Sequence, residues 1–600
     1  MSLTPKQSEV VEATTGHYVV LAGPGCGKTH TITEKILYIF EKETIPEPHC
    51  LLAVTFTDAA ARIMRARLRS KGFNQWNRIW VGTFHSFGRH GLECYGSDIG
   101  IREDFEIIEL DKRNLMLEQL IKKHSIGFFH SDLGSFFDRL KRNGIYPEQG
   151  DDNLPFKIRE AYKEYNRILR EGNLLDFGDL VALAVKLIRE SDFVKRLYTR
   201  RFRYVIVDEF QDTDKQQLEI IRLLAESAIG STIVGDDDQS IFGWRGALRE
   251  NVYKIKELLN STEIVLAQNF RSDEVIVEAA VKVIGFDPNR RDKEMEPVSK
   301  ERGHLYRHEF NDPEDEAKYV VKWINKILNN NMVSDPGNIA IIARARYRTG
   351  WIIQEMNRIG VPWFDSSRLN FEDSWETALG LAIIELAHTP NSGLSLHRVL
   401  AAVEEGGLAF RLGDKDALDI ALRIHDQLKK SENLEFDPKK VNKILDAAGM
   451  KEIIRNASAG VSDVKRRITN LEKMMEDISS EAEKNNIDLL RVIDRFSGRG
   501  AIQIISGHQS KGGEFDIVFF IGLEDDVLPD YRAHKDEEKL AEERRIFYVG
   551  LTRTRKAAYL TSVTHRPMRG WVKNAIPSRF IGHIPDEYFS GIPDEYFSDN

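Results

Sequence analysis

The stretch HYVVLAGPGCGKTHTITEKILYIF, which begins at His17, constrains the fold more than any other part of the chain. An apolar run rich in valine is followed by a glycine-rich loop ending in Lys-Thr, and then by a run with helical periodicity. Small residues in such a loop let backbone N–H groups converge on a phosphate, and the start of the next helix favours negative charge. The order strand, loop, helix therefore predicts a phosphate-binding turn in an α/β sheet, and a chance glycine-rich turn is the weaker interpretation.

The same pattern assigns roles within this loop. Lys28 is expected to reach the β- and γ-phosphates of a nucleotide, and Thr29 is expected to ligate Mg²⁺. The backbone of the loop is expected to hold the phosphates, through Gly23, Gly25, Cys26 and Gly27. We therefore expect a bound nucleotide triphosphate with its metal.

A second run, YVIVDEFQD, places two adjacent carboxylates directly after an apolar strand. Acidic pairs are common on protein surfaces, but they are much less common immediately after a buried strand. Asp208 is the candidate Mg²⁺ carboxylate, and Glu209 is the candidate base or orienting group for an attacking water. The two runs together predict a site that hydrolyses the nucleotide.

Short apolar runs predict two open sheets. Such runs, bounded by Gly, Asp or Thr, are typical of buried parallel strands, and the first set is HYVVLAG, CLLAVTF, RIWVGTF, RYVIVDEF, STIVGDD and EIVLAQN. The second set follows residue 300 and comprises NIAIIARA, AIQIISG, DIVFFIGL and AAYLTSV. A chain of 600 residues exceeds what one core usually serves, so several α/β domains are expected.

Two charged helical stretches, residues 88–199 and 369–495, interrupt these sets and predict helical insertions. The heptad-like spacing from Asp463 covers only about three heptads, which favours packing inside the protein over an intermolecular coiled coil. At the end of the chain, IPDEYFS occurs twice, at 584–590 and 592–598. This acidic, aromatic tail, 583–600, is expected to be a solvated extension, with a docking peptide as the alternative.

Composition excludes several classes of protein. Three cysteines are too few and too scattered for a disulfide framework or a cysteine-rich metal site, which indicates a reducing compartment. The sequence shows no apolar run of membrane-spanning length and no signal peptide, so a cytoplasmic location without membrane contact is expected. The net charge of −9 argues against unspecific coating of nucleic acid, but it does not exclude a local basic groove.

The loop IVGDDDQSIFGWRGAL, residues 233–248, combines carboxylates, an amide, two aromatics and an arginine. Carboxylates and an amide suit a metal-bound phosphate, whereas Phe242 and Trp244 suit a flat apolar partner. A loop with both could report the state of one ligand to the other. Taken alone, the loop is equally well explained as an acidic turn whose two aromatics fill the core.

These residues resemble the UvrD/Rep-like family of superfamily-one DNA helicases over about residues 3 to 582. The resemblance is carried by nine motifs in the family's order: LTPKQSEVV, GPGCGKT, AVTFTDAAARIM, VGTFHSF, VIVDEFQDTD, IVGDDDQSIFGWRGA, QNFRS, HQSKGGEF and EERRIFYVGLTRTR. The resemblance implies an α/β protein with two RecA-like cores, each with a helical insertion, that moves 3′ to 5′ on single-stranded DNA using ATP and Mg²⁺. On this basis the cores are expected at 1–87 with 200–268, and at 269–368 with 496–582.

The resemblance also implies how the nucleotide is held. Gln7 is expected to read the adenine edge, Phe270 to stack on the base, and Glu514 to hold the ribose. Arg271 and Arg553 are expected to approach the γ-phosphate as arginine fingers, and Gln239 to sense the γ-phosphate or the attacking water. His30 stands where the family often has an arginine that stacks on adenine, so the resemblance implies weaker or pH-dependent clamping of the base.

The same resemblance implies a set of DNA contacts. Aromatic side chains stack on bases without regard to sequence, which suits a protein that moves along a strand. The implied contacts are Phe56, Thr83, His85, Phe242, Trp244, Arg245 and His508. Gly513 replaces the usual leucine, which could loosen the loop beside Glu514, and the second insertion is shorter than is usual for the family.

Three functions stay open on the sequence alone. The first is an ATP-driven translocase that unwinds duplex DNA in repair, replication restart or recombination, as a monomer or weak oligomer acting on single strands and junctions. The second is a helicase subunit that depends on a nuclease or repair partner, as in phage defence. The chain ends soon after GLTRTRKAAYLTSV, so such a nuclease is expected to be a separate protein. The third is a binding module switched by ATP without processive unwinding.

Overall fold

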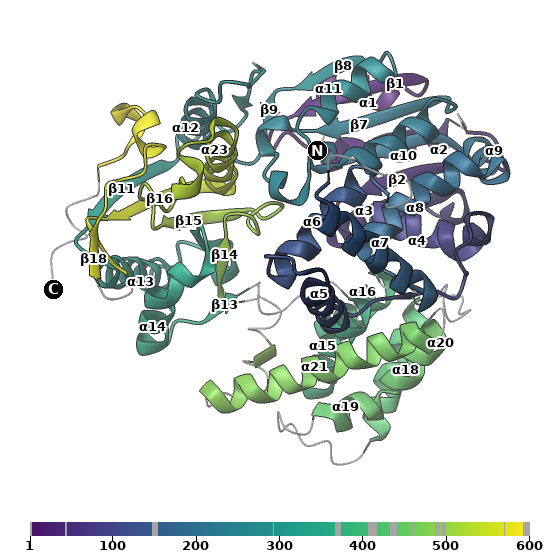
Figure 1. The fold of residues 1–600 in the computed structure, drawn as a ribbon. Helices are drawn as coiled ribbons and strands as arrows, with labels where there is room; N and C mark the ends of the chain where they lie inside the picture. Colours follow the sequence, from purple (N-terminus) through teal and green to yellow (C-terminus); the bar gives the residue numbers. More distant parts are fainter. Residues whose placement is uncertain are drawn as a thin grey trace. The chain divides into compact units, whose positions relative to one another are not determined.

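The structure is a computed structural model, and it describes most of the chain. The residues outside the description are 1–2, 43–44, 147–153, 292, 366–373, 406–407, 409–416, 432–440, 459–460, 486–488, 490–491, 494–499, 569–570 and 592–600. The chain divides into two compact units (Figure 1). The first unit comprises Met1–Gln268 and Arg291–Met295, and the second comprises Asn269–Arg290 and Glu296–Asn600.

The first unit is built on a six-stranded sheet with the order β3-β2-β6-β7-β1-β8, in which all pairs are parallel. Its strands are β1 Gly16–Ala22, β2 Cys50–Thr55, β3 Ile79–Thr83, β6 Phe202–Val207, β7 Gly230–Gly235 and β8 Thr262–Leu266. All six runs predicted from the sequence are confirmed as strands. Because both faces of such a sheet are covered, most strand residues are apolar, and polar residues such as Glu263 of the edge strand β8 are the exceptions.

Helices cover both faces of this sheet (Figure 1). Val20 and Ala22 of β1 share a core with α1 Pro5–Glu12, α2 Lys28–Glu41 and α3 Asp58–Ser70. Val19 and Leu21 point to the opposite core, which includes α4 Phe84–Tyr95, α8 Phe177–Glu190, α9 Asp192–Arg201, α10 Lys215–Ala225 and α11 Asn251–Leu258. The carboxyl ends of the central strands are thereby held in fixed positions, and the predicted site residues follow them.

Between β3 and β6 the chain is mostly helical. Besides α4, α8 and α9 it forms α5 Leu110–His124, α6 His130–Arg142, α7 Phe156–Glu171 and a small parallel pair, β4 Glu106–Ile107 with β5 Leu174–Leu175. The helices α5, α6 and α7 enclose an apolar cluster of their own that includes Leu117, Phe137 and Tyr162. Because α8 packs on both α4 and α6, this helical part is joined to the sheet through buried side chains.

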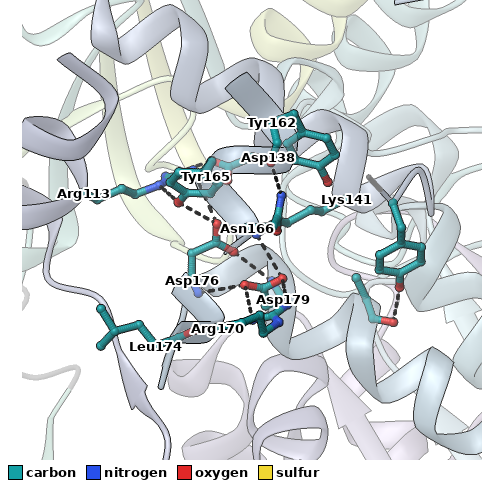
Figure 2. Close-up of polar contacts among 12 residues, drawn as sticks. Arg113, Asp138, Lys141, Tyr162, Tyr165, Asn166, Arg170, Leu174, Asp176 and Asp179 are labelled. Carbon is teal, nitrogen blue, oxygen red and sulfur yellow. Dashed lines mark hydrogen bonds and ion pairs between the residues drawn. The ribbon is translucent and has the colours of Figure 1, made fainter. Parts of the chain in front are cut away.

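A buried ionic network fixes the start of α8 against α6 and α7 (Figure 2). The Lys141 ammonium, only 1% exposed, lies 2.7 Å from an oxygen of Asp176 and 3.0 Å from one of Asp179. The hydroxyl of Tyr165 donates to Asp176 at 2.8 Å, and Arg113 donates to that hydroxyl at 2.9 Å. Buried charges are tolerated when each has a partner of this kind. The network therefore joins the start of α8 to α6 and α7, and through Arg113 to α5, by polar contacts.

The second unit contains another six-stranded sheet, with the order β11-β16-β15-β12-β14-β13 and parallel pairing throughout. The strands are β11 His304–Phe310, β12 Ile339–Ala343, β13 Trp363–Asp365, β14 Ile502–Ser506, β15 Phe515–Ile521 and β16 Thr554–Val563. The helices of this part are α12 Glu274–Ile284, α13 Pro313–Asn329, α14 Gly350–Ile359 and α23 Glu537–Leu551. The four predicted runs are confirmed as β12, β14, β15 and β16, whereas the two edge strands were not predicted.

A second helical part lies between β13 and β14 in the sequence. It comprises α15 Trp375–His388, α16 Gly393–Glu405, α18 Ala417–Lys430, α19 Val441–Ala447, α20 Met450–Ala457 and α21 Val461–Asn485. The heptad-like residues Leu471, Met474 and Ile478 of α21 are buried in the common core of these helices. Their periodicity therefore reflects packing inside the chain, as predicted. No helix in the described part of the chain is long and apolar enough to span a membrane.

The first copy of the repeated tail does not extend into solvent. Ile584 is buried, and the backbone N–H of Ser590 donates to the carbonyl of Leu305 in β11 at 2.8 Å. The Asp586 carboxylate lies 2.8 Å from the guanidinium of Arg307, which also covers the ring of Phe589. The expectation of a solvated extension is therefore wrong for 584–590, and the second copy lies outside the described residues.

Candidate nucleotide site and DNA platform

The glycine-rich loop joins β1 to α2 and has the backbone that a phosphate cradle needs. Gly25 and Gly27 have φ values of +74° and +79°, a region that side chains with a Cβ rarely adopt. Gly27 is also the N-cap of α2, and a Cβ at this position would lie 2.7 Å from Nε2 of Gln7. The loop therefore brings its N–H groups to the start of a helix of 14 residues, where anions are favoured.

Gln7 is the predicted reader of the adenine, and it lies directly against this loop. The capping box of α1 holds its side chain, since Oε1 accepts from the N–H of Thr4 at 3.0 Å. Its Nε2 donates to the carbonyl of Cys26 at 3.2 Å. Burial raises the pKa of the Cys26 thiol to about 12, so Cys26 can contribute its backbone but not a thiolate.

Lys28 and Thr29 begin α2 beside the first acidic strand end. The Lys28 ammonium donates to the carbonyl of Ala22 at 3.2 Å, so it lies over the loop. The Thr29 hydroxyl lies 3.5 Å from a carboxylate oxygen of Asp208. The structure thus brings Thr29 and Asp208 together, as the prediction of a shared metal requires.

The chemistry of Asp208 fits a divalent cation. Burial raises the pKa of Asp208 to about 7, and the adjacent Glu209 carboxylate acts in the same direction. A bound cation would favour the charged carboxylate and offset this cost. One hydroxyl and one carboxylate, completed by phosphate oxygens and water, form a donor set that Mg²⁺ commonly takes.

Glu209 follows in a strained backbone conformation. Its φ of +55° is uncommon for a residue with a side chain, and such strain is concentrated at functional sites. Its N–H donates to the carboxylate of Asp208 at 2.9 Å, and its own carboxylate accepts from the amide of Gln211. Gln211 therefore orients the group that was predicted to act on water.

The aspartate-rich loop continues the same hydrogen-bonded chain. The Oε1 of Gln211 accepts from the N–H of Asp236 at 2.8 Å, and the Nε2 of Gln239 donates to the Asp236 carboxylate at 2.5 Å. Both Asp236 and Gln239 are buried. Glu209 and Gln239, predicted from two separate motifs, are thus linked through Gln211 and Asp236.

The three aspartates of this loop are close enough to hold a metal, but an amino group lies among them. The Lys293 ammonium forms ion pairs with Asp236, Asp237 and Asp238. Burial would raise the pKa of Asp237, but Lys293 and Arg249 outweigh it and hold the pKa below its ordinary value. These carboxylates are thus paired with a cation of the chain itself, and the hypothesis that they serve a metal-bound phosphate stays a prediction. Sequence reasoning missed Lys293, because a lysine in NRRDKEMEP carries no distinguishing pattern.

At the other end of the loop, aromatic rings gather around one arginine. Trp244 is 69% exposed, so the alternative that it fills the core is wrong. Phe242 stacks on Phe56 with ring centroids 5.5 Å apart. The Arg245 guanidinium lies 5.6 to 5.7 Å from the rings of Phe56, Phe242 and Trp244. We call these four residues the aromatic platform.

The remaining predicted DNA contacts are neutral or structural. Thr83 is buried and caps α4, where its hydroxyl accepts from the N–H of Ser86 at 3.2 Å. Burial lowers the pKa of both His85 and His508 to about 4, so neither imidazole is charged near pH 7. His85 lies in the first unit and faces the ring of Phe177, whereas His508 lies in the second unit.

In the second unit, the predicted fingers lie around one loop. The Arg271 guanidinium donates to the Glu514 carboxylate at 3.0 Å and to the carbonyl of Thr552 at 3.3 Å. Arg553 is buried, and it donates to the carbonyls of Val549 and Gly513 at 2.8 and 3.4 Å. Phe270 is 37% exposed. The structure therefore brings together Arg271, Glu514 and Arg553.

The structure shows the surroundings of two departures from the family pattern, Gly513 and His30. A Cβ at Gly513 would lie 3.0 Å from the ring of Phe515, so a leucine would crowd that ring. His30 lies 3.7 Å from Glu34 on the next turn of α2. Burial lowers the pKa of His30, which leaves a neutral ring near pH 7.

A phosphate loop on an open parallel sheet, with a second parallel sheet in the same chain, defines a two-core P-loop nucleotide-binding protein. The model of the UvrD/REP helicase N-terminal domain matches residues 3–260, and that of the UvrD-like helicase C-terminal domain matches 264–484 and 454–565. The chain therefore belongs to the UvrD-like helicase family, and its two cores are RecA-like.

Curated relatives include the ATP-dependent DNA helicase PcrA of Staphylococcus aureus (strain Mu50), which is 27% identical over 634 residues. That alignment covers 97% of this chain and 86% of the relative. PcrA of Staphylococcus epidermidis (strain ATCC 35984) is also 27% identical, with the same coverage of both chains.

Proposed function

We propose that this protein is an ATP-dependent translocase that moves 3′ to 5′ along single-stranded DNA and unwinds duplexes at junctions. Family membership indicates an ATP-hydrolysing helicase that uses ATP with Mg²⁺. The direction of movement, and a role in repair, replication restart or recombination, are proposed from the resemblance to the UvrD/Rep-like helicases. A cytoplasmic enzyme is in keeping with its three free cysteines.

One observation carries the proposal. A single loop, which starts at the end of β7, holds Gln239 at one end and three members of the aromatic platform, Phe242, Trp244 and Arg245, at the other. Gln239 is hydrogen-bonded through Asp236 and Gln211 to Glu209 at the candidate water site. The γ-phosphate and the DNA would therefore both act on the same short segment.

The proposal assigns a role to each predicted residue of the nucleotide site. Lys28, Thr29 and Asp208 would hold the β- and γ-phosphates and Mg²⁺, which neutralises charge on the transferring phosphoryl group. Glu209 would orient or deprotonate water. Gln7, His30 and Phe270 would contact the base, and Glu514 would hold the ribose. Arg271 and Arg553 would supply positive charge to the γ-phosphate from the second core.

The DNA contacts follow from the platform. Trp244, Phe242 and Phe56 would stack on bases, with Arg245 among them. His85 and His508 would act as neutral hydrogen-bonding or stacking groups, and Thr83 would contact DNA through the beginning of α4, which it caps.

We further propose that two helical subdomains are inserted into the cores. Residues 88–199 would be inserted into the first core, 1–87 with 200–268. Residues 369–495 would be inserted into the second core, 269–368 with 496–582. The protein would act as a monomer or weak oligomer.

DNA-dependent ATP hydrolysis tests this function. Because the nucleotide and DNA groups share one loop, the ATPase rate is expected to rise many-fold with single-stranded DNA and much less with blunt duplex. The measurement is steady-state phosphate release with saturating oligonucleotide, with blunt duplex and without DNA. A rate without DNA that equals the stimulated rate would refute the proposed coupling.

The exposed Trp244 provides a second prediction. Trp244→Ala is expected to weaken single-strand binding by the ~1–3 kcal/mol of one lost stack, which is about 5- to 150-fold in Kd. Thermal stability and basal ATPase are expected to stay close to wild type, because the side chain is largely outside the core. Fluorescence anisotropy with a labelled oligonucleotide measures the affinity.

Trp351→Ala is the matched control, since this tryptophan is also exposed but lies on α14, outside the motifs. Its DNA affinity is expected to equal that of wild type. A large fall in the melting temperature of Trp244→Ala, with a proportional loss of every activity, would instead show a packing role.

A further inference from the structure

The segment Arg291–Met295, which we call the strap, packs with the first unit although the chain on both sides of it belongs to the second. Among its described residues, the Arg291 guanidinium lies 3.5 Å from the ring centroid of Tyr253. Met295 lies beside the phosphate loop, since a Cβ at Gly23 would be 3.0 Å from its sulfur. The strap therefore contacts α11 at one end and the glycine-rich phosphate loop at the other.

Lys293, in the middle of the strap, is the main cation of the aspartate cluster. Its side chain is 7% exposed, and its ammonium pairs with Asp236, Asp237 and, at 3.1 Å, with Asp238. Arg249 is the second cation, 3.1 Å from Asp237 and 3.8 Å from Asp238. Because buried carboxylates are costly unless paired, removal of Lys293 would take away the one ammonium that these three carboxylates share.

Asp236 connects this cluster to both candidate groups at the γ-phosphate. One of its carboxylate oxygens accepts from Lys293, and the other accepts from the amide of Gln239. Its N–H donates to Gln211, which in turn donates to Glu209. A displacement of the Asp236 side chain or backbone would therefore affect Gln239 directly, and would affect Glu209 through Gln211.

We propose that Lys293 is a positioning residue for hydrolysis, which holds Gln239 and Glu209 in place through Asp236. This inference rests on the proposed function. If the second unit moves during turnover, the movement would act on the strap from both of its ends, because the strap is covalently continuous with that unit on each side. Through the strap, such a movement would reach the aspartate-rich loop that carries Asp236 and Gln239.

The test compares Lys293→Met with Lys293→Arg in the full chain. Methionine keeps the length of the side chain but removes its charge, and arginine restores the charge with a different shape. A misplacement of about 1 Å at a reacting group can cost ~10²-fold, so kcat for ATP in single-stranded DNA is expected to fall by that order in Lys293→Met. The KM for ATP and the Kd for DNA are expected to change little, and Lys293→Arg is expected to recover part of kcat.

Two further variants separate positioning from packing. Lys254→Met on α11 removes an exposed lysine whose partner is Glu250, and its kcat is expected to match wild type. The double variant Lys293→Met/Asp238→Asn restores the net charge of the cluster but not the contact with Asp236. We expect it to recover thermal stability while kcat stays low.

The outcomes are distinct. If wild type shows DNA-stimulated ATPase and folded Lys293→Met turns over at the wild-type rate, the inference is wrong and the proposed function stands. Recovery of both stability and kcat in the double variant would show that Lys293 only balances charge, and would overturn the positioning role. A wild-type protein without ATPase activity would overturn the proposed function, and this inference with it.

Discussion

Arg271→Ala is expected to lower the turnover number for ATP by ~10³- to 10⁵-fold, the usual cost of an arginine finger. The physical reason is that the phosphoryl group spreads negative charge in the transition state, and a positioned guanidinium stabilises that charge. In the structure Arg271 is held by Glu514 and by the carbonyl of Thr552, so its side chain is already oriented. Single-turnover hydrolysis in the presence of single-stranded DNA is the measurement.

Arg555 offers a matched control, because its guanidinium also binds Glu514 and lies 3.2 Å from Asp516. Arg555→Ala removes an arginine from the same carboxylate without removing the proposed finger, and a much smaller loss is expected. Equal losses in both variants would mean that the effect acts through Glu514, and the finger role of Arg271 would have to be abandoned.

Glu209→Gln is expected to reduce ATP turnover by ~10²- to 10⁴-fold, the range for a lost general acid–base group. The amide can still contact Gln211, so the loop is expected to keep its fold and nucleotide binding is expected to persist. Phosphate release measures turnover, and equilibrium binding of a fluorescent ATP analogue measures affinity.

Glu226→Gln is the control for this substitution, because Glu226 lies at the end of α10 and pairs with Arg222 on the protein surface. Its turnover is expected to equal that of wild type. Near-normal turnover in Glu209→Gln would show that another group activates the water.

The strands were predictable where burial dictates their composition. The central strands β2, β6 and β7 of the first sheet are almost fully buried, and the sequence runs located all six strands to within a few residues. By contrast, β11 has the sequence HLYRHEF and lies at a sheet edge, where polar side chains are exposed and the apolar signal is weak. The other edge strand, β13, has only three residues.

The site was predictable where function resides in a contiguous motif. Lys28, Thr29, Asp208 and Glu209 each follow a strand end, and the sheet brings those ends together. The exposure of Trp244 could not be decided from spacing, since an aromatic in a loop can face either way. The role of Lys293 could not be predicted from the sequence, because its partners lie more than fifty residues away in the sequence and only the fold brings them together.

The central claim is directional, ATP-driven unwinding, and strand displacement tests it most directly. Labelled duplexes with a 3′ tail, a 5′ tail or blunt ends are incubated with the protein, with and without ATP and Mg²⁺. We predict displacement of the 3′-tailed duplex only when ATP is present, with little activity on the other two. Displacement that favours the 5′ tail would contradict the proposed direction, and DNA-stimulated ATP hydrolysis without displacement of any substrate would contradict unwinding itself.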